Sequence, residues 1–314
     1  MDSASCSSSP QGDAISVTSG ATPRAHRLAI NGLILNVLEW AGDLTLPPLL
    51  LLHGGMAHAH WWAPLVQALD GRLRAFAPDR RGHGESDWAD TEQYGIRRDL
   101  EDTEAIAADL GLERCVVVGH SQGGLLAVLL ALEGRLPCAG LALVDTPFDP
   151  ASPSLRATGE RLRRIPQINF PNLQAATRRF QPWPPQHRIP ATVLSGLADR
   201  SFRPATDGGF TSRFDWRVMR APSGETPHPF LDFPKKFTAL HLPVLAVRAG
   251  DSTILDVDDH ARMLERLPKG RGLVIPETTH SLHVERPDLL AEGLVAFVKE
   301  LSNPPVGATD RAEA

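Results

Sequence analysis

Gly119-His120-Ser121-Gln122-Gly123 follows the apolar run Cys115-Val116-Val117-Val118 and opens a Leu- and Ala-rich stretch, 121–133. A run of β-branched residues bounded by turn residues favours a buried strand, so the order predicts a strand, a sharp turn and a helix. The glycines match the G-x-S-x-G pattern, in which a strained turn lifts the serine into an exposed position. The helix behind it offers unpaired N–H groups. We therefore predict Ser121 as a catalytic nucleophile.

Outward from this turn, short apolar runs alternate with longer helical patterns. The strand candidates are residues 48–52, 74–77, 115–118, 141–144, 243–247 and 272–275. The helix candidates are residues 61–69, 94–110, 121–133, 259–267 and 287–301. Such alternation is typical of parallel strands joined by crossover helices. It predicts an α/β fold with a mostly parallel central sheet and helices on both faces.

The alternation breaks in the middle of the chain. Prolines crowd residues 148–240, and no strand pattern is visible there. We predict a core of residues 24–147 and 241–302, with 148–240 inserted as a mostly helical lid over the carboxyl edge of the sheet. Residues 1–23 and 303–314 are polar, and we expect a disordered leader and a flexible tail.

The composition excludes several classes of protein. A net charge of −5 and a pI near 6.2 argue against nucleic-acid binding. The three cysteines, Cys6, Cys115 and Cys138, are too few for a disulfide framework, and no C-x-x-C appears, so we expect no structural zinc and a reducing compartment. The start of the chain lacks the basic and apolar parts of a signal peptide, and no apolar run reaches membrane-helix length. We expect a cytoplasmic protein without a membrane partner.

Two backbone N–H groups are candidates for an oxyanion hole. His53-Gly54-Gly55 follows the strand candidate 48–52, and Gln122 follows Ser121. A tetrahedral intermediate needs two donors aimed at its oxygen. We predict that the N–H groups of Gly55 and Gln122 supply them.

A histidine follows the last predicted strand. His280 lies in Pro276-Glu277-Thr278-Thr279-His280, at the carboxyl edge, where open α/β sheets bind ligands. A neutral imidazole there can accept the serine proton and pass it to the leaving group. His283 is the nearby rival, and we expect Glu285 to anchor the loop.

These motifs fall in the order found in the α/β-hydrolase superfamily, which the chain resembles over residues 28–147 and 240–301. The matching stretches are His53-Gly54-Gly55, Asp79-Arg80-Arg81-Gly82-His83-Gly84-Glu85-Ser86, the turn at Ser121, and His280. The resemblance implies a serine-nucleophile hydrolase that needs no metal or organic cofactor. It also implies a structural role for the loop 79–86.

The third member of the triad departs from the usual pattern. The superfamily usually places its acid after the strand that follows the lid, three residues beyond a glycine; Ala249 occupies that glycine position here, so Ser252 stands where the acid would be. Asp251 is one residue away, and Asp256 is further along. Haloalkane dehalogenases, fluoroacetate dehalogenases and zearalenone lactonases are similar to one another in placing the acid elsewhere. Their acid follows the strand after the nucleophile turn (the nucleophile elbow), and this chain has Asp145 there. We predict Asp145, with Asp251 as the alternative.

The substrate-binding residues are the least defined. Trp61 and Trp62 follow the oxyanion segment and either line a pocket or pack the next helix. The predicted lid holds Trp183 among other aromatic residues, and it carries fourteen Lys or Arg against six Asp or Glu between residues 151 and 240. A cationic lid is either a solvated face or a means of attracting anionic substrates. We predict Trp61 and Trp183 as substrate-binding residues.

The leading functional hypothesis is hydrolysis of a small-molecule carboxylic ester or lactone through an acyl-serine intermediate. Dehalogenases and epoxide hydrolases of the superfamily use Asp where this chain has Ser121. Carbon–carbon bond hydrolysis and cofactor-free perhydrolysis use the same triad and stay open. A ligand-sensing protein on a hydrolase scaffold, similar to plant hormone receptors of the superfamily, is the alternative from another class.

Overall fold

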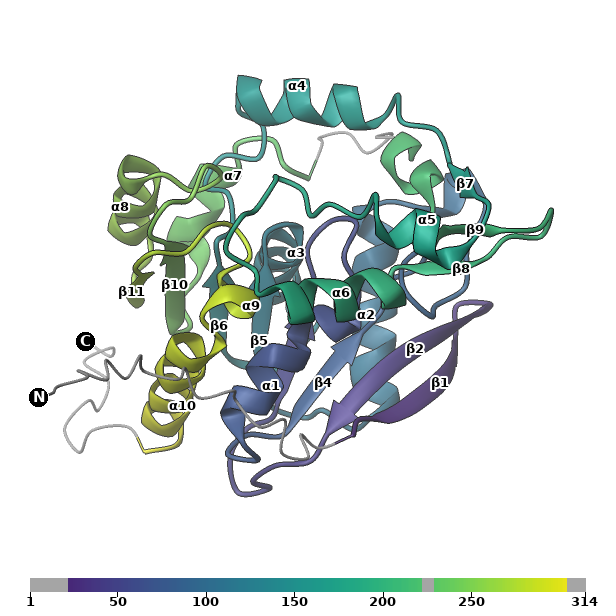
Figure 1. Ribbon diagram of the computed structural model, residues 1–314. Coiled ribbons are helices and arrows are strands. Elements are labelled where there is room, and N and C mark those ends of the chain that lie inside the picture. The colour runs from purple at the N-terminus through teal and green to yellow at the C-terminus, as the bar shows by residue number, and fades with distance from the viewer. Residues whose placement is uncertain (1–21, 222–228, 304–314) are drawn as a thin grey trace, which may run out of the picture.

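An eight-stranded mixed sheet runs through the computed structural model, which describes residues 22–221 and 229–303 (Figure 1). Its order is β1-β2-β4-β3-β5-β6-β10-β11, and the strands from β4 to β11 pair in parallel. The strands are β1 Arg24–Ile30, β2 Leu33–Trp40, β3 Leu49–Leu52, β4 Ala75–Pro78, β5 Cys115–His120, β6 Cys138–Val144, β10 Val244–Ala249 and β11 Gly270–Ile275. The predicted fold class is confirmed. The described residues include only 22 and 23 of the predicted leader and only 303 of the predicted tail. The rest of both segments lies outside the described residues.

The antiparallel hairpin β1–β2 at the edge of the sheet was not predicted from the sequence. Strand β1 has only one buried residue, Ile30, so it lacks the continuous apolar run that marked the central strands. Asn31 and Gly32 form the two-residue turn with φ of 48° and 79°. An Asn-Gly pair between two such stretches is a strong hairpin signal, and it was available in the sequence.

Helices cover both faces of the sheet. They are α1 Ala63–Leu69, α2 Ile96–Asp109, α3 Gln122–Leu132, α8 Val257–Arg266 and α10 Pro287–Ser302. Alternate residues of each central strand join opposite cores, because successive side chains of a strand point to opposite faces. Leu50 and Leu52 of β3 belong to the hydrophobic cluster that includes side chains of α2, α3 and α8, whereas Leu49 and Leu51 belong to the cluster that includes side chains of α1 and α10.

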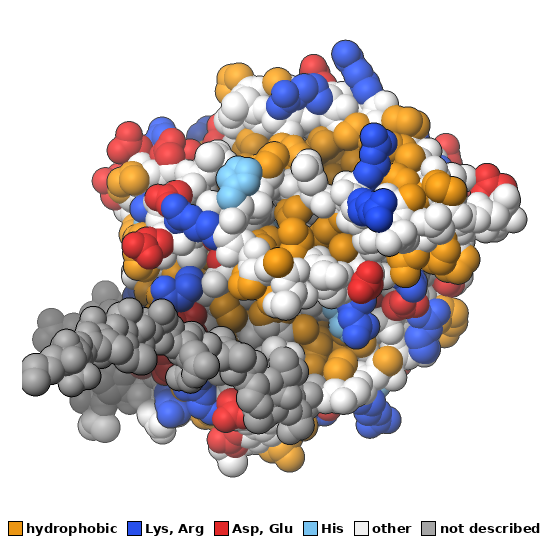
Figure 2. Space-filling view, in the orientation of Figure 1, with side chains coloured by type: hydrophobic (Ala, Val, Ile, Leu, Met, Phe, Trp, Pro, Cys, Tyr) orange, Lys and Arg blue, Asp and Glu red, His pale blue; other side chains and the backbone are white. Residues whose placement is uncertain are grey.

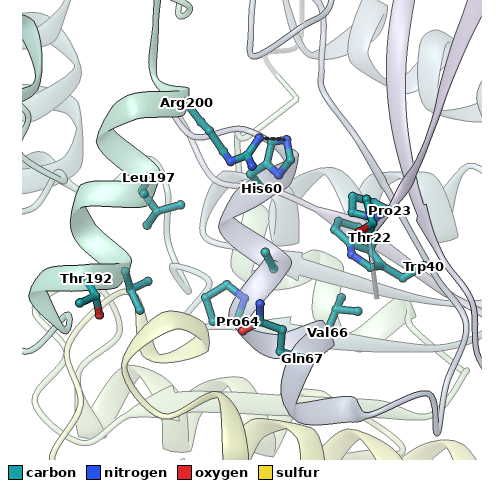
Figure 3. Close-up of a pocket in the computed structure, with 13 residues that line it drawn as sticks. Thr22, Pro23, Trp40, His60, Pro64, Val66, Gln67, Thr192, Leu197 and Arg200 are labelled. Carbon is teal, nitrogen blue, oxygen red and sulfur yellow. Dashed lines mark hydrogen bonds between the residues drawn. The ribbon is translucent and has the colours of Figure 1, made fainter. Parts of the chain in front are cut away.

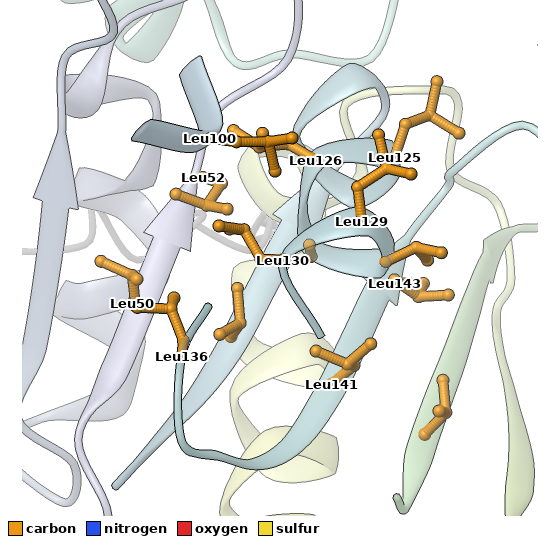
Figure 4. Packing of buried hydrophobic residues seen from close by; sticks show 14 of the residues in the cluster. Leu50, Leu52, Leu100, Leu125, Leu126, Leu129, Leu130, Leu136, Leu141 and Leu143 are labelled. Atoms are coloured by element: carbon orange, nitrogen blue, oxygen red, sulfur yellow. The ribbon is translucent and has the colours of Figure 1, made fainter. Parts of the chain in front are cut away.

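Figure 4 shows the first of these cores, in which leucines of α3 cover leucines of β3 and β6. Leu126 and Leu130 of α3 and Leu143 of β6 have no exposed surface. Burying one such side chain contributes about 1.5–3 kcal/mol of stability. This packing holds the start of α3, and hence Ser121, against the end of β5.

The predicted lid is not purely helical. Its helices are α4 Pro153–Leu162, α5 Leu173–Thr177, α6 Ala191–Arg200 and α7 Phe233–Lys236, with 3-10 turns at Trp216–Arg220 and Phe237–Ala239. A three-stranded antiparallel sheet also forms, from β7 Asn169–Phe170, β8 Phe202–Pro204 and β9 Phe210–Ser212. These strands left no visible pattern in the sequence, because runs of two or three residues are too short to show a period-two alternation.

This insert lies largely above the sheet in Figure 1, with α4 at the top of the molecule, α5 below it and α6 at about the level of α9. Shorter elements lie between it and the core: the 3-10 turns Ala59–Trp62 and Thr91–Gln93, and the helix α9 Leu282–Glu285. A hydrophobic cluster joins the two parts, with Leu197 of α6 packed against Trp61 and Val284. Within the described part of the chain, every helix is too short or too polar to cross a bilayer.

Candidate active site

The turn at Ser121 has the backbone strain expected of a nucleophile elbow. Ser121 has φ 52° and ψ −118°, between β5 and α3, and its side chain is partly exposed. A Cβ on Gly119 would lie 2.3 Å from the Gly123 carbonyl oxygen, and one on Gly123 would lie 2.1 Å from the Leu52 carbonyl oxygen. Both positions therefore require glycine, because real side chains do not make such contacts.

His280 and Asp145 form a hydrogen-bonded pair beside this turn. His280 Nδ1 donates to Asp145 Oδ2 over 2.8 Å, and both side chains are buried. The backbone N–H of Ala249 donates to Asp145 Oδ1 at 3.0 Å, and Ser252 Oγ donates to Oδ2 at 2.7 Å. The carboxylate therefore accepts on both oxygens, and it leaves Nε2 of the imidazole as the nitrogen available for proton transfer.

The structure does not bring the alternative acid to His280. Asp251 pairs instead with Arg188 of the insert, with 2.6 Å between Oδ2 and Nη1, and its side chain is 55% exposed. Ser252, at the position where the resemblance led us to expect an acid, donates its hydroxyl to Asp145 instead. Asp256 caps α8 by accepting from the Asp259 N–H.

Four hydrogen bonds hold the loop that carries His280. His120 Nε2 donates to the His280 carbonyl oxygen at 2.8 Å, and the two rings lie 4.5 Å apart. Glu285 accepts from the Thr279 N–H at 2.6 Å and from its hydroxyl, as the predicted anchoring role requires. From the insert, Gln186 Oε1 accepts from the Ser281 N–H at 2.8 Å. The residues on both sides of His280 are thus fixed.

The rival histidine has a different environment. His283 is buried against Trp62 and His120, with ring centroids 4.7 Å and 4.3 Å away. Burial, and to a lesser extent the nearby His280, lowers the pKa of His283 to about 3. Its Nδ1 is buried without a hydrogen-bond partner among the described residues. His283 is therefore a neutral packing residue here, while His280 holds the carboxylate.

The two residues that carry the candidate oxyanion donors lie close together beside Ser121. A Cβ on Gly55 would lie 3.2 Å from Gln122 Oε1. Gln122 is the first residue of α3, where a helix leaves its N–H groups without intrahelical acceptors. His53 Nδ1 donates to the Gly54 carbonyl oxygen at 2.8 Å, which fixes the peptide that carries the Gly55 N–H. Within the described residues, no hydrogen bond joins Ser121 Oγ to His280.

The loop 79–86, to which the resemblance gave a structural role, contacts this site through a residue that was not predicted. Arg80 is buried and donates through Nη2 to the Gly54 carbonyl oxygen at 3.2 Å and to Gln122 Oε1 at 3.1 Å. Its Nη1 binds Asp99 of α2 at 3.0 Å. The doubled arginine at positions 80 and 81 was visible in the sequence, but nothing there indicated which of the two points to the elbow.

A cavity of about 340 Å³ opens beside the elbow, between core and insert. Gly55, His120 and Ser281 form its floor, and the insert supplies much of its wall. The aromatic lining residues are Trp61, Phe170, Phe180, Trp183, Phe202, Phe214 and Trp216. Both predicted binding residues, Trp61 and Trp183, are among them, whereas Trp62 is fully buried in the core. Figure 2 shows hydrophobic side chains gathered on this face, between α4 and α6.

Two further cavities lie around the insert. One of about 660 Å³ reaches Gln122 from the other side and is lined by charged side chains of α2 and α4. The other, of about 370 Å³, lies between α1 and α6 (Figure 3), where Arg200 bonds to His60 at 3.2 Å. Among the described residues, none of the three linings includes Ser121 or His280 themselves. The 340 Å³ and 660 Å³ cavities reach residues next to them, His120 and Ser281 in one and Gln122 in the other, whereas the 370 Å³ cavity reaches none of these.

Comparisons with known proteins identify the family to which the chain is similar. Residues 49–293 match the model of the alpha/beta hydrolase family. The esterase Rv0045c of Mycobacterium tuberculosis is 27% identical over 278 residues, covering 87% of this chain and 88% of the relative. Its solved structure superposes with a TM-score of 0.72 at 25% identity, covering 89% and 93% of the two chains. Epoxide hydrolase 4 of Mus musculus is 37% identical over 275 residues, covering 83% and 75%. The sn-1-specific diacylglycerol lipase ABHD11 of Mus musculus is 26% identical over 274 residues, covering 84% of each chain.

Proposed function

The chain belongs to the α/β-hydrolase family, and we propose that it is a serine hydrolase that cleaves a carboxylic ester or lactone through an acyl-serine intermediate. The observation that carries this proposal is the 2.8 Å bond from His280 Nδ1 to the buried Asp145 carboxylate, beside a strained serine. A buried carboxylate in this position holds the tautomer of the imidazole and stabilises the imidazolium that forms. Asp145, rather than Asp251, is the acid we assign.

The proposed reaction follows from these positions. Ser121 Oγ attacks the carbonyl carbon of the substrate while His280 Nε2 takes its proton. The N–H groups of Gly55 and Gln122 stabilise the oxyanion. The intermediate collapses, the bond to the alcohol oxygen breaks, and His280 returns the proton to that oxygen. A water activated by His280 then attacks the acyl-enzyme, which releases the carboxylic acid and frees Ser121.

The cavities favour an ester with an apolar part. An ester carbonyl carries two substituents, and two cavities reach residues next to Ser121, one at Gln122 and the other at His120. The smaller one is walled by aromatic side chains, which suits an uncharged acyl or alcohol group of modest size. We assign the insert as the lid of this cavity, with Trp61 and Trp183 in contact with the substrate.

The name of the mouse relative epoxide hydrolase 4 does not change this preference. If Ser121 opened an epoxide, an ether would join the enzyme to the product. An ether has no carbonyl that water could attack, so the enzyme would not be regenerated. A serine nucleophile therefore fits acyl transfer, in which the intermediate is an ester.

The test is turnover of p-nitrophenyl acetate and butyrate by wild type, Ser121→Ala, Asp145→Asn and Asp251→Asn, each checked for folding. We expect Ser121→Ala to lose turnover and Asp145→Asn to lose about 10³–10⁴-fold in kcat. Asp251→Asn is the matched control and retains activity. Equal rates for wild type and Ser121→Ala would refute a serine hydrolase for these esters and would move carbon–carbon hydrolysis, perhydrolysis or ligand sensing ahead.

A further inference from the structure

We propose that Arg80 is a positioning residue that holds both oxyanion donors in place. This inference rests on the proposed function, because it concerns the two residues that we assign to the oxyanion hole. One buried guanidinium binds the carbonyl oxygen of Gly54 and the side chain of Gln122. Its charge partner is Asp99, in the first turn of α2.

The bond to Gly54 acts on the neighbouring N–H. A peptide group is planar, so fixing the carbonyl oxygen of Gly54 also fixes the direction of the Gly55 N–H. Two successive glycines offer little resistance to rotation of the peptide between them. Arg80 Nη2 and His53 Nδ1 both donate to this oxygen, at 3.2 Å and 2.8 Å. Rotating the peptide would break both bonds and leave a buried guanidinium and a buried imidazole with unpaired donors.

The backbone of Arg80 takes part as well. Its N–H donates to His53 Nε2 at 3.2 Å, so the proton of this imidazole is on Nδ1, facing the Gly54 oxygen. Burial, and then the charge of Arg80, lowers the pKa of His53 well below its usual value, which keeps the ring neutral. The main chain and the side chain of one residue thus orient the same peptide.

The bond to Gln122 acts on the second donor. Arg80 Nη2 lies 3.1 Å from Gln122 Oε1, and the Gln122 N–H follows directly after Ser121. A cation bound to the Gly54 carbonyl also polarises that peptide, which strengthens the Gly55 N–H as a donor. In a buried site such prearranged dipoles stabilise the oxyanion without reorganisation.

The neighbouring arginine shows what a structural role looks like in this loop. Arg81 binds Asp102 with Nε and Nη2, both at 2.7 Å, and donates Nη1 to the Gln93 carbonyl oxygen. Arg80 instead leaves Nε buried without a partner among the described residues. An arginine placed for stability alone would satisfy that donor, so the geometry of Arg80 favours its contacts with Gly54 and Gln122 over complete pairing.

The experiment compares two double variants that each remove one buried ion pair between this loop and α2. They are Arg80→Met/Asp99→Asn and Arg81→Met/Asp102→Asn, in the full chain. The measurements are kcat and KM for p-nitrophenyl butyrate and inhibition by phenylboronic acid, which forms a tetrahedral adduct with the serine. For the Arg80 pair we expect kcat to fall about 10–100-fold and the boronate affinity to fall by a similar factor, with KM little changed. For the Arg81 pair we expect lower stability but kcat close to wild type.

Arg80→Lys adds a conservative variant that keeps Asp99 paired. A lysine donates from one nitrogen, whereas the guanidinium of Arg80 donates from two, Nη1 and Nη2, so we expect kcat between those of wild type and the Arg80 double variant. Equal kcat in the two double variants, with wild type active, would overturn the role of Arg80 alone. Wild type that neither turns over the ester nor reacts at Ser121 with a fluorophosphonate would overturn the proposed function and this inference together.

Discussion

Removing the side chain of Ser121 is expected to make the protein more stable while it abolishes turnover. With φ 52° and ψ −118°, Ser121 lies outside the left-handed region that non-glycine residues tolerate, in a part of conformational space that glycine populates more readily. Such a residue costs about 1–3 kcal/mol. Within the described residues, Ser121 Oγ makes no hydrogen bond, so its removal forfeits none.

The size of the gain follows from two opposing effects. Ser121→Gly relieves the strain but adds about 0.4–1 kcal/mol of chain entropy to the unfolded state. The net gain is about 1 kcal/mol, which at about 2.1 cal/mol/K of unfolding entropy per residue raises the Tm of a 314-residue chain by about 1.5 °C. Ser121→Ala removes the same hydroxyl but keeps the Cβ and the strain, so it is the matched control and is expected to stay close to wild type.

The assay is thermal unfolding of the three proteins by calorimetry, with urea midpoints as a second measure. Both variants lose ester turnover, so only their stability distinguishes them. The reasoning would be refuted if Ser121→Gly unfolded at or below the midpoint of Ser121→Ala. In that case the elbow would carry no strain that a side chain makes worse, and its conformation would need another explanation.

Three further predictions concern the surroundings of the site. Because the pKa of His283 is lowered to about 3, the unfolded chain binds a proton below about pH 6.5 that the folded chain does not, so stability is lost as the pH falls. Between pH 6 and pH 5 the free energy of unfolding of His283→Phe, measured by urea titration, should fall by about 1 kcal/mol less than that of wild type. Equal decreases in the two proteins would contradict this. Gln186→Ala removes the hydrogen bond that holds the backbone next to His280 and should lower kcat about 5–10-fold. The control Gln174→Ala, at an exposed site of the insert, should leave kcat unchanged. Equal kcat for the two variants would show that Gln186 does not help to position His280. Phe180→Ala enlarges the aromatic cavity and should raise the kcat/KM ratio of hexanoate to acetate ester about 10-fold, and an unchanged ratio would place the acyl chain elsewhere.

The central strands were predictable because both of their faces are buried. Leu49–Leu52 and Cys115–His120 have no exposed residues in the structure, and such strands show as continuous apolar runs bounded by turn residues. The edge hairpin and the small sheet of the insert lack that signal. Asn31-Gly32 was the missed cue for the first, whereas the strands at 169–170, 202–204 and 210–212 are held by long-range contacts that no local pattern encodes.

The candidate acid shows where prediction from sequence stops. Strands β6 and β10 are neighbours in register, with Val144 opposite Val247, so the residues that follow them reach the same edge of the sheet. Either loop can therefore supply a carboxylate to His280, and sequence order does not choose between them. The choice depends on backbone direction: Asp145, at φ 45°, lies buried under the imidazole, whereas Asp251 faces outward to Arg188. Aspartate tolerates positive φ better than most residues, which suits it to that turn. Because Asp145 supplies the carboxylate from the end of β6, the position after β10 only has to donate a hydrogen bond to it. The hydroxyl of Ser252 makes that bond.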